Sequence, residues 1–176
     1  AARAVYEALG QKNNVEIIWA GNTISSHSMN EVIEALDKKT SIYVDCIAKN
    51  FETLEPGIAF RVIRNYMKNR YGESYGERIY VTFTENTKSW KLAEDNGFTP
   101  LPFPNEIGGR FTALSPICLF PLAAAGFDIK AIARGAREME ERLKNDLSVS
   151  NIALQYATLR TMLKEKGKSV ELLSYF

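Results

Sequence analysis

The strongest constraint on the fold is an alternation of short β-rich apolar runs with longer segments of helical period. The run "VEIIWAG" is followed by "SMNEVIEALDKK", in which apolar residues recur every three to four positions. The same alternation repeats twice further along the chain. Strands that alternate with helices are typical of a parallel sheet covered on both faces. The sequence therefore predicts a three-layer α/β fold with right-handed crossovers.

The order of the elements can be predicted along the whole chain. Strands are expected over 15–21, 41–48, 78–83, 98–104 and 169–176, and helices over 1–10, 28–39, 53–70, 86–97, 111–125, 128–145 and 150–166. No repeat or linker divides residues 1–176, so a single domain with a sizeable core is expected. The first ten residues, "AARAVYEALG", lack an initiator methionine and begin within a helix. We therefore expect the chain to be cut from a longer protein or processed.

Charge and cysteine content narrow the class of protein. The net charge of +1 gives no sign of a nucleic-acid-binding surface. No apolar run reaches the roughly 20 residues that span a bilayer, and no secretory signal is visible, so we expect no membrane partner. Cys46 and Cys118 lie in apolar surroundings without metal-ligand spacing. We interpret them as reduced core residues of a cytoplasmic protein, and we expect no metal site.

The loop over 48–53 is a candidate anion site, because parallel α/β sheets bind ligands beyond the carboxyl ends of their strands. In "IAKNFETLEPGIAF", Thr53 is expected to cap the following helix, with Pro56 in the first turn. Free N–H groups and the positive helix end attract an anion, and Lys49 adds a mobile charge. The alternative is an ordinary turn with a surface lysine.

The loop over 104–110 is a second candidate, in the stretch "NEIGGRFTALSP". Gly108 and Gly109 permit positive φ values and close approach of a ligand to the backbone. Arg110 offers a planar set of donors that suits phosphate or a developing negative charge. The alternative is a tight turn in which Arg110 pairs with a nearby carboxylate.

Longer stretches give the chain a family resemblance. "IGGRFTALSP" resembles a signature segment of the glucose-6-phosphate isomerase family, and the similarity extends to "AGNTISSHSMNEVIEAL", "AKNFETLEPGIAFRVIRNYM", "LFPLAAAGFDIKAIARGARE" and "KGKSVELLSYF". The resemblance implies a sugar-isomerase (SIS) domain, a flavodoxin-like αβα sandwich with a five-stranded parallel sheet. It implies a cytoplasmic, dimeric enzyme of glycolysis and gluconeogenesis. That enzyme interconverts glucose 6-phosphate and fructose 6-phosphate through an enediol, without metal or cofactor.

The resemblance also assigns roles to residues of both loops. Arg110 matches the arginine that stabilises the enediolate, and it is the one catalytic residue expected in this chain. The residues expected to bind the sugar phosphate are Ala48, Lys49, Asn50, Glu52, Thr53, Gly108 and Gly109. Relative to the family the chain is expected to be truncated at both ends. The glutamate base, the ring-opening histidine, a late lysine and a glycine–serine phosphate loop would then lie outside it.

The phosphate loop departs from the family pattern of serine, lysine, serine or threonine, a variable residue and two threonines. Only Lys49 and Thr53 are unchanged, because Ala48 lacks a hydroxyl and Asn50 replaces one with an amide. A carboxylate at Glu52, about 5 Å from a phosphate, would cost roughly 3 kcal/mol per unit charge pair at an effective dielectric near 20. If Glu52 faces solvent, screening reduces that cost.

Three functions therefore stay open. The first is the sugar-phosphate-binding domain of an isomerase, which would be inactive without its missing parts. The second is a degenerate isomerase or a non-enzymatic sugar-phosphate sensor, which Ala48 and Glu52 favour. The third is a structural or dimerising domain, which an Arg110 bound to a buried carboxylate would support. The single histidine, His27, lies outside the context of the family's catalytic histidine and is interpreted as a loop or helix-start residue, with a substrate contact as the alternative.

Overall fold

The computed structural model describes residues 1–49, 51 and 53–172. The chain forms two compact units, Ala1–Ile129 and a helical unit that begins at Lys130. No helix in the described part of the chain is long and apolar enough to cross a membrane. The candidate site residues all belong to the first unit, which is described first.

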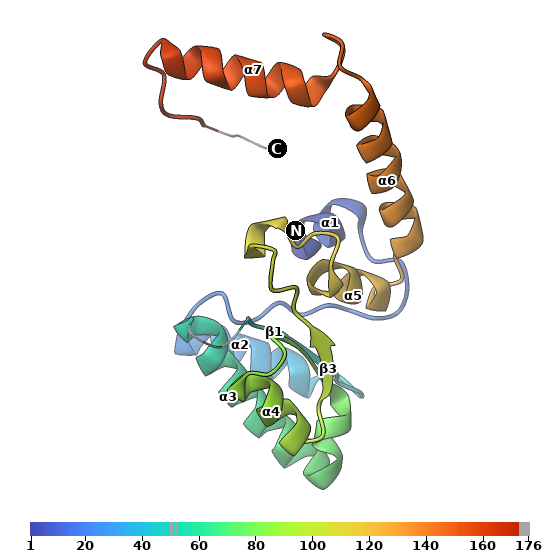
Figure 1. Cartoon of the computed structure of the whole chain (residues 1–176). Helices are drawn as coiled ribbons and strands as arrows, with labels where there is room; N and C mark the ends of the chain where they lie inside the picture. The colour runs from blue at the N-terminus through green and yellow to red at the C-terminus, as the bar shows by residue number, and fades with distance from the viewer. Residues whose placement is uncertain (50, 52, 173–176) are drawn as a thin grey trace. The chain divides into compact units, whose positions relative to one another are not determined.

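A parallel sheet forms the centre of the first unit (Figure 1). Its strands are β1 (Val44–Ile47), β2 (Ile79–Phe83) and β3 (Thr99–Pro102), in the order β1-β2-β3. Asp45 pairs with Tyr80 between β1 and β2, and Tyr80 pairs with Thr99 between β2 and β3. The prediction of an α/β fold with a parallel sheet is confirmed.

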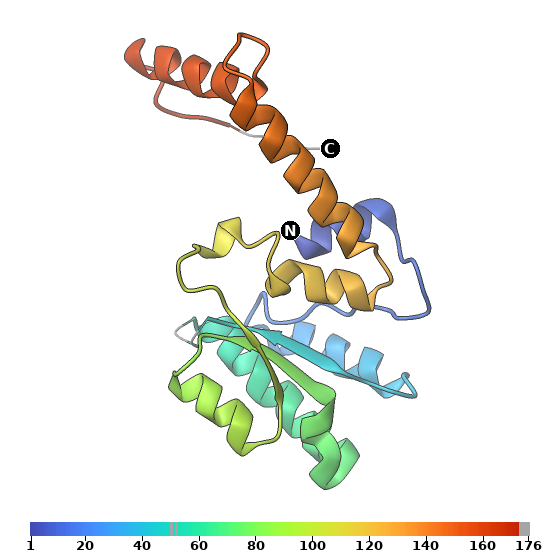
Figure 2. The same cartoon turned by 45° about the vertical axis from the view of Figure 1, so that its right-hand side comes forward.

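Helices cover both faces of this sheet (Figure 2). On one face lie α2 (Ser26–Asp37), α3 (Leu54–Tyr71) and α4 (Lys88–Asp95). On the other lie α1 (Ala2–Leu9) and α5 (Pro116–Ala124). A short 3-10 segment, η1 (Gly72–Arg78), leads from α3 into β2, and another, η2 (Gly109–Phe111), precedes α5.

The main core lies between the sheet and helices α2, α3 and α4. Alternate strand residues point into it, among them Cys46 of β1 and Val81 and Phe83 of β2. Phe83 and Met67 of α3 are fully buried there. The opposite strand residues face α5, where the Tyr80 ring lies 4.9 Å from that of Phe120. Because side chains alternate between the two faces of a strand, neighbouring residues of one strand pack against helices on opposite faces of the sheet.

The expected five-stranded sheet is wrong, because the described residues form three strands. The segment 15–21 is extended but pairs with no described strand, although its composition is β-rich. A strand is defined by hydrogen bonds to a neighbour, so suitable composition alone does not make one. This segment and β1 both line a groove of about 960 Å³. Residues 169–172 are not strand either, and 173–176 lie outside the described residues.

The predicted helix over 111–125 begins later than expected, at Pro116. The Ser115 hydroxyl donates to the Thr112 carbonyl oxygen at 2.7 Å, which holds the preceding residues in turns. Proline suits the first helical position because the N–H group of that position has no partner within the helix, so its absence costs no hydrogen bond.

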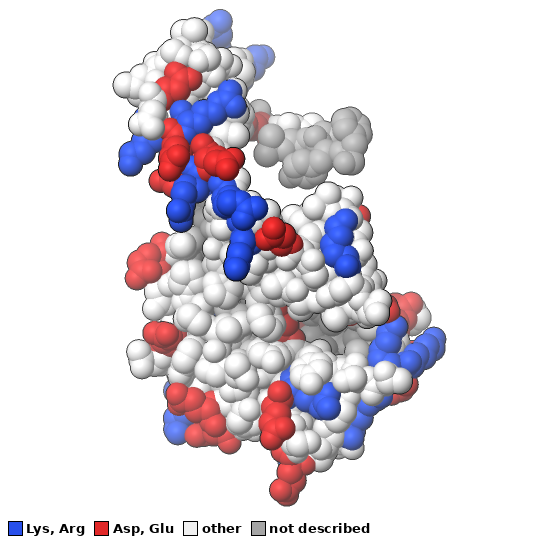
Figure 3. Space-filling model, turned by 90° about the vertical axis from the view of Figure 1, so that its right-hand side faces the viewer, with Lys and Arg blue, Asp and Glu red and all other residues white. Residues whose placement is uncertain are grey.

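The second unit consists mainly of α6, which begins at Ile129 and ends at Asn145, and α7 (Ile152–Glu165). Basic and acidic side chains lie close together on its exposed surface (Figure 3). Asn151 fixes the turn between the helices and is only 3% exposed. Its amide donates to the Leu143 and Asp146 carbonyl oxygens at 2.8 and 2.6 Å. Its side-chain oxygen accepts from the Ala153 and Leu154 N–H groups.

We expect Asn151→Ala to destabilise the α6–α7 turn by about 2 kcal/mol, because it removes a helix cap and leaves carbonyl oxygens unpaired. Amide hydrogen exchange in the first turn of α7 measures the effect. Asn151→Asp keeps the capping acceptor but loses the amide donors, so an intermediate loss is expected. Unchanged exchange in Asn151→Ala would contradict this role.

Candidate functional site

The candidate site lies at the edge of the sheet where all three strands end. Because the strands are parallel, their carboxyl ends and the loops that follow meet at this edge. Backbone hydrogen bonds extend the ladder into the loops. The Thr84 N–H donates to the Lys49 carbonyl oxygen at 3.1 Å, and the Phe103 N–H donates to the Phe83 carbonyl oxygen at 2.9 Å. The first residues of these loops are therefore held by the sheet itself.

The loop between β1 and α3 carries most of the predicted phosphate-binding residues. Ala48 is buried, and its N–H donates to the Thr82 carbonyl oxygen. The Lys49 side chain is exposed, with its ammonium 5.8 Å from the centre of the Phe103 ring. Asn50 and Glu52 lie outside the described residues. Lys49 is thus anchored through its backbone while its charge remains available to a ligand.

Phe51, which sequence reasoning did not single out, holds this loop against the core. Its φ of 58° is left-handed, which costs a bulky L-residue roughly 1–2 kcal/mol. Its ring stacks on Phe60 at 5.4 Å and meets Phe83 edge-on at 5.0 Å. Each aromatic pair contributes about 0.5–1.5 kcal/mol beyond its buried area, so ring packing offsets the backbone cost. The sequence signal was an aromatic residue within an otherwise polar loop.

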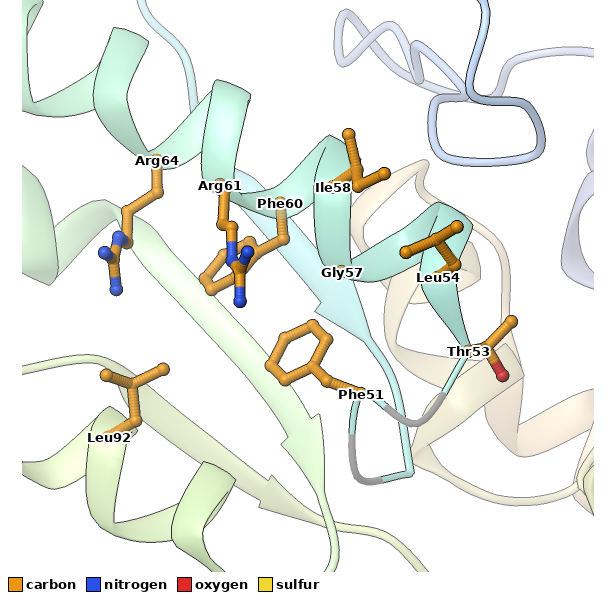
Figure 4. A pocket seen from close by; sticks show the side chains of 9 residues that line it. All are labelled: Phe51, Thr53, Leu54, Gly57, Ile58, Phe60, Arg61, Arg64 and Leu92. Atoms are coloured by element: carbon orange, nitrogen blue, oxygen red, sulfur yellow. The ribbon is translucent and has the colours of Figure 1, made fainter.

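Thr53 occupies the N-cap position of α3, as expected, and Pro56 lies in the first turn. The expected capping hydrogen bond is absent, because the Thr53 side chain accepts none from the described helix N–H groups. The side chain is exposed instead, at the rim of a pocket of about 320 Å³ (Figure 4). Its hydroxyl therefore remains available to a ligand.

The glycine pair in the loop after β3 does not use the positive φ values that glycine permits. Gly108 has φ −67° and ψ 147°, and Gly109 begins the 3-10 turn η2. The Phe111 N–H donates to the Gly108 carbonyl oxygen at 2.9 Å, and the Thr112 hydroxyl donates to that of Gly109 at 2.6 Å. A Cβ at Gly109 would meet no atom within 4 Å. Nothing inside the described chain requires glycine at 109.

Arg110 is exposed and makes no hydrogen bond or ion pair with any residue that the structure describes. The alternative in which it binds a buried carboxylate is therefore not supported. Lys49 follows β1 and Arg110 lies in the segment after β3, so the parallel strands bring the starts of both loops to the same edge of the sheet.

Asp45 is a second residue that sequence reasoning missed. Both its carboxylate oxygens are buried and have no hydrogen-bond partner in the described part of the chain, and the same is true of the Thr82 and Thr84 hydroxyls. Burial raises the pKa of Asp45 from 3.8 to about 7, because the charged form is poorly solvated. Asp45 and residues 15–21 line the same groove. The one signal in the sequence is an acid within an apolar strand.

Comparison with known proteins places this chain in a family. A sequence model of phosphoglucose isomerase matches residues 2–166, which include every candidate site residue. The chain belongs to this family. It is 43% identical over 169 residues to glucose-6-phosphate isomerase of Caldanaerobacter subterraneus, covering 93% of this chain and 37% of that protein. It is 36% identical over 184 residues to the enzyme of Exiguobacterium sibiricum, covering 98% of this chain and 41% of that protein.

The chain spans about two fifths of the length of these curated relatives. A solved structure of a hypothetical protein from Thermus thermophilus is similar, with a TM-score of 0.75 and 27% sequence identity. The likeness covers 82% of this chain and 35% of that one. The resemblance inferred from the sequence motifs is confirmed at the level of the family.

His27 follows the N-terminal residue of α2, and its imidazole lies 3.6 Å from the exposed carboxylate of Glu31. This position agrees with a helix-start residue. No group of three or more histidine, cysteine, aspartate or glutamate side chains in the described ranges could hold a metal ion.

Proposed function

We propose that this chain is the sugar-phosphate-binding part of a glucose-6-phosphate isomerase. The observation that carries the proposal is an Arg110 that has no partner among the described residues, beside a glycine pair, within a chain that matches the phosphoglucose isomerase family. A glycine whose added Cβ would meet no atom of the described chain is suited to the approach of a ligand. An arginine without a protein partner is suited to an anion.

In this proposal the Lys49 ammonium, the Thr53 hydroxyl and the N-terminal N–H groups of α3 hold the substrate phosphate. The isomerisation removes the proton from C2 and returns one to C1, while the hydroxyl proton on O2 finally resides on O1. Negative charge develops on the enediolate oxygens between these steps. The Arg110 guanidinium donates hydrogen bonds to those oxygens, which lowers the barrier. The base and the group that opens the ring come from the rest of the longer protein, so the chain alone does not isomerise the sugar.

A phosphorus NMR titration of the chain with glucose 6-phosphate tests the binding half of this proposal. We expect saturable binding. Arg110→Ala is expected to weaken it by about tenfold or more, because the substitution removes one charge-assisted hydrogen bond. Arg137→Ala removes the same charge from an exposed position on α6 and is expected to leave binding unchanged. Equal weakening by both variants would mean that only net charge matters and would contradict a specific role for Arg110. Inorganic phosphate separates the phosphate contribution from that of the sugar.

A degenerate isomerase that only senses sugar phosphate is the second candidate. It is favoured by Ala48, which is buried and offers no hydroxyl to a phosphate. An isomerase assay on the longer natural protein distinguishes the two candidates. Turnover supports the enzyme, whereas binding without turnover supports the sensor.

Location and assembly of the whole protein are further parts of the proposal. We place it in the cytoplasm, where thiols stay reduced, since Cys46 and Cys118 are free and buried. The expected homodimer rests on the family resemblance and stays a prediction.

A further inference from the structure

A pocket of about 320 Å³ lies between α3 and α4, beside the loop that contains Phe51. Its apolar lining includes the rings of Phe51 and Phe60 and the side chain of Leu92 from α4. Arg61 and Arg64 of α3 extend toward this lining, as Figure 4 shows. The pocket therefore combines a flat apolar wall with two cationic groups.

The sequence of α3 explains this arrangement. Positions three and four apart share a helix face, so Gly57, Phe60, Arg61 and Arg64 all line the pocket. A Cβ at Gly57 would lie 3.8 Å from the Phe51 ring, so the glycine leaves space beside that ring. Because an α-helix rises about 1.5 Å per residue, Arg61 lies roughly 12 Å along α3 from Thr53. The two arginines thus lie well along α3 from its N-terminal end.

The two guanidinium groups lack partners, whereas the acids on the facing helix have them. Neither Arg61 nor Arg64 makes an ion pair or a hydrogen bond with a residue in the described ranges. On α4, the Asp95 carboxylate accepts from the Lys91 ammonium at 3.0 Å, and Glu94 accepts from the Trp90 indole at 3.0 Å. Two neighbouring cations on one helix repel each other, and an anion bound to both would remove that repulsion.

We propose that this pocket binds a small organic anion with a flat apolar body, such as an aryl phosphate or an aryl carboxylate. The body packs against Phe51 and Leu92, and the anionic group accepts hydrogen bonds from Arg61 and Arg64. The volume is at the small end of the range for ligand sites, about 300–1,000 Å³, and suits a single ring with its head group. Arginine is the side chain whose planar donors best match a phosphate or a carboxylate. This proposal does not depend on the isomerase function.

The probe is phenyl phosphate, and phenol and inorganic phosphate represent its two halves. Each compound is titrated into the chain, and binding is measured by calorimetry and by amide chemical shifts. We expect saturable binding of phenyl phosphate, at least tenfold tighter than either half, with shifts at Leu92 and along α3. The double variant R61Q/R64Q is expected to lose at least tenfold in affinity. Both side chains are at the surface of the helix, and circular dichroism checks that the variant remains folded.

A charge-matched control separates a built site from general attraction to a basic helix. The double variant K68Q/R137Q removes two positive charges at exposed positions, one of them on α3, and is expected to bind within twofold of the parent. Equal losses in the two double variants would overturn the proposal. So would phenol binding as tightly as phenyl phosphate, or the absence of saturable binding.

Discussion

Asp45→Asn is expected to stabilise the chain at about pH 8 by up to roughly 4 kcal/mol, one of the two largest effects we predict. The carboxylate of Asp45 is buried without a hydrogen-bond partner among the residues that the structure describes, and burial raises its pKa from 3.8 to about 7. Each unit of pKa difference corresponds to about 1.4 kcal/mol between the protonation states. An asparagine amide is neutral throughout, so it avoids the cost of a buried charge.

The direction of the pH dependence follows from the same shift. The folded chain binds the Asp45 proton more tightly than the unfolded chain does. The contribution of Asp45 to the free energy of unfolding is therefore greatest near and below pH 3.8, and it is lost as the pH rises to about 7. The other charged groups along the groove, Glu16 and Lys39, pair with each other. Burial and the neighbouring Asp45 raise the pKa of the Cys46 thiol, so that group stays neutral.

Urea unfolding at about pH 5 and about pH 8 measures this effect. The parent chain is expected to lose stability between the two conditions, and Asp45→Asn is expected to lose much less. Glu106→Gln, at an exposed acid, is the matched control and is expected to behave as the parent. A parent chain equally stable at both pH values would contradict the buried, unpartnered state of Asp45.

Phe83→Ala is expected to destabilise the first unit by about 3–5 kcal/mol, which for a domain of ordinary stability is close to unfolding. Phe83 is fully buried at the end of β2 and contacts the rings of both Phe51 and Phe60. Its removal leaves a cavity and also takes away one of the two ring contacts that hold Phe51. The loop that contains Lys49 is therefore expected to loosen together with the core.

Thermal unfolding measures the stability loss, and hydrogen exchange at the Thr84 N–H, which donates to the Lys49 carbonyl oxygen, measures the loosening of the loop. Phe83→Leu keeps most of the buried volume and is expected to recover a large part of the stability. Its exchange at Thr84 should remain faster than in the parent, because the ring contact to Phe51 is still missing. Loss of stability without any change in this exchange would contradict the expected coupling between the core and the loop.

Much of the fold was predictable because it is encoded locally. The β-rich runs around Val44, Ile79 and Thr99 gave three strands, and the helical periods gave α2, α3 and α4 within a few residues. The prediction of a strand over 15–21 failed because a strand must also pair with a neighbour, and the sequence of one segment does not determine that pairing. The late start of α5 depends on turns fixed by Thr112 and Ser115, which periodicity does not detect.

The candidate site was predictable where it depends on residue type and position along the chain. Lys49, Thr53 and Arg110 were expected at strand ends, and the parallel topology places their loops at one edge. The conformation of Gly108 was not predictable, since glycine permits positive φ without requiring it. The left-handed Phe51 and the buried Asp45 were missed because each depends on residues distant in sequence. Phe83 packs on Phe51, and Asp45 lies in the groove that the segment 15–21 also lines.

The outer edge of β1 has a consequence for how the chain behaves in solution. A sheet edge presents unpaired backbone N–H and C=O groups, which can template the addition of a foreign strand and so promote aggregation. Asp45 is the one charged residue of this edge strand, and its carboxylate oxygens are buried, so β1 presents no charged group to an added strand. The edge therefore lacks the exposed charge with which many edge strands resist aggregation.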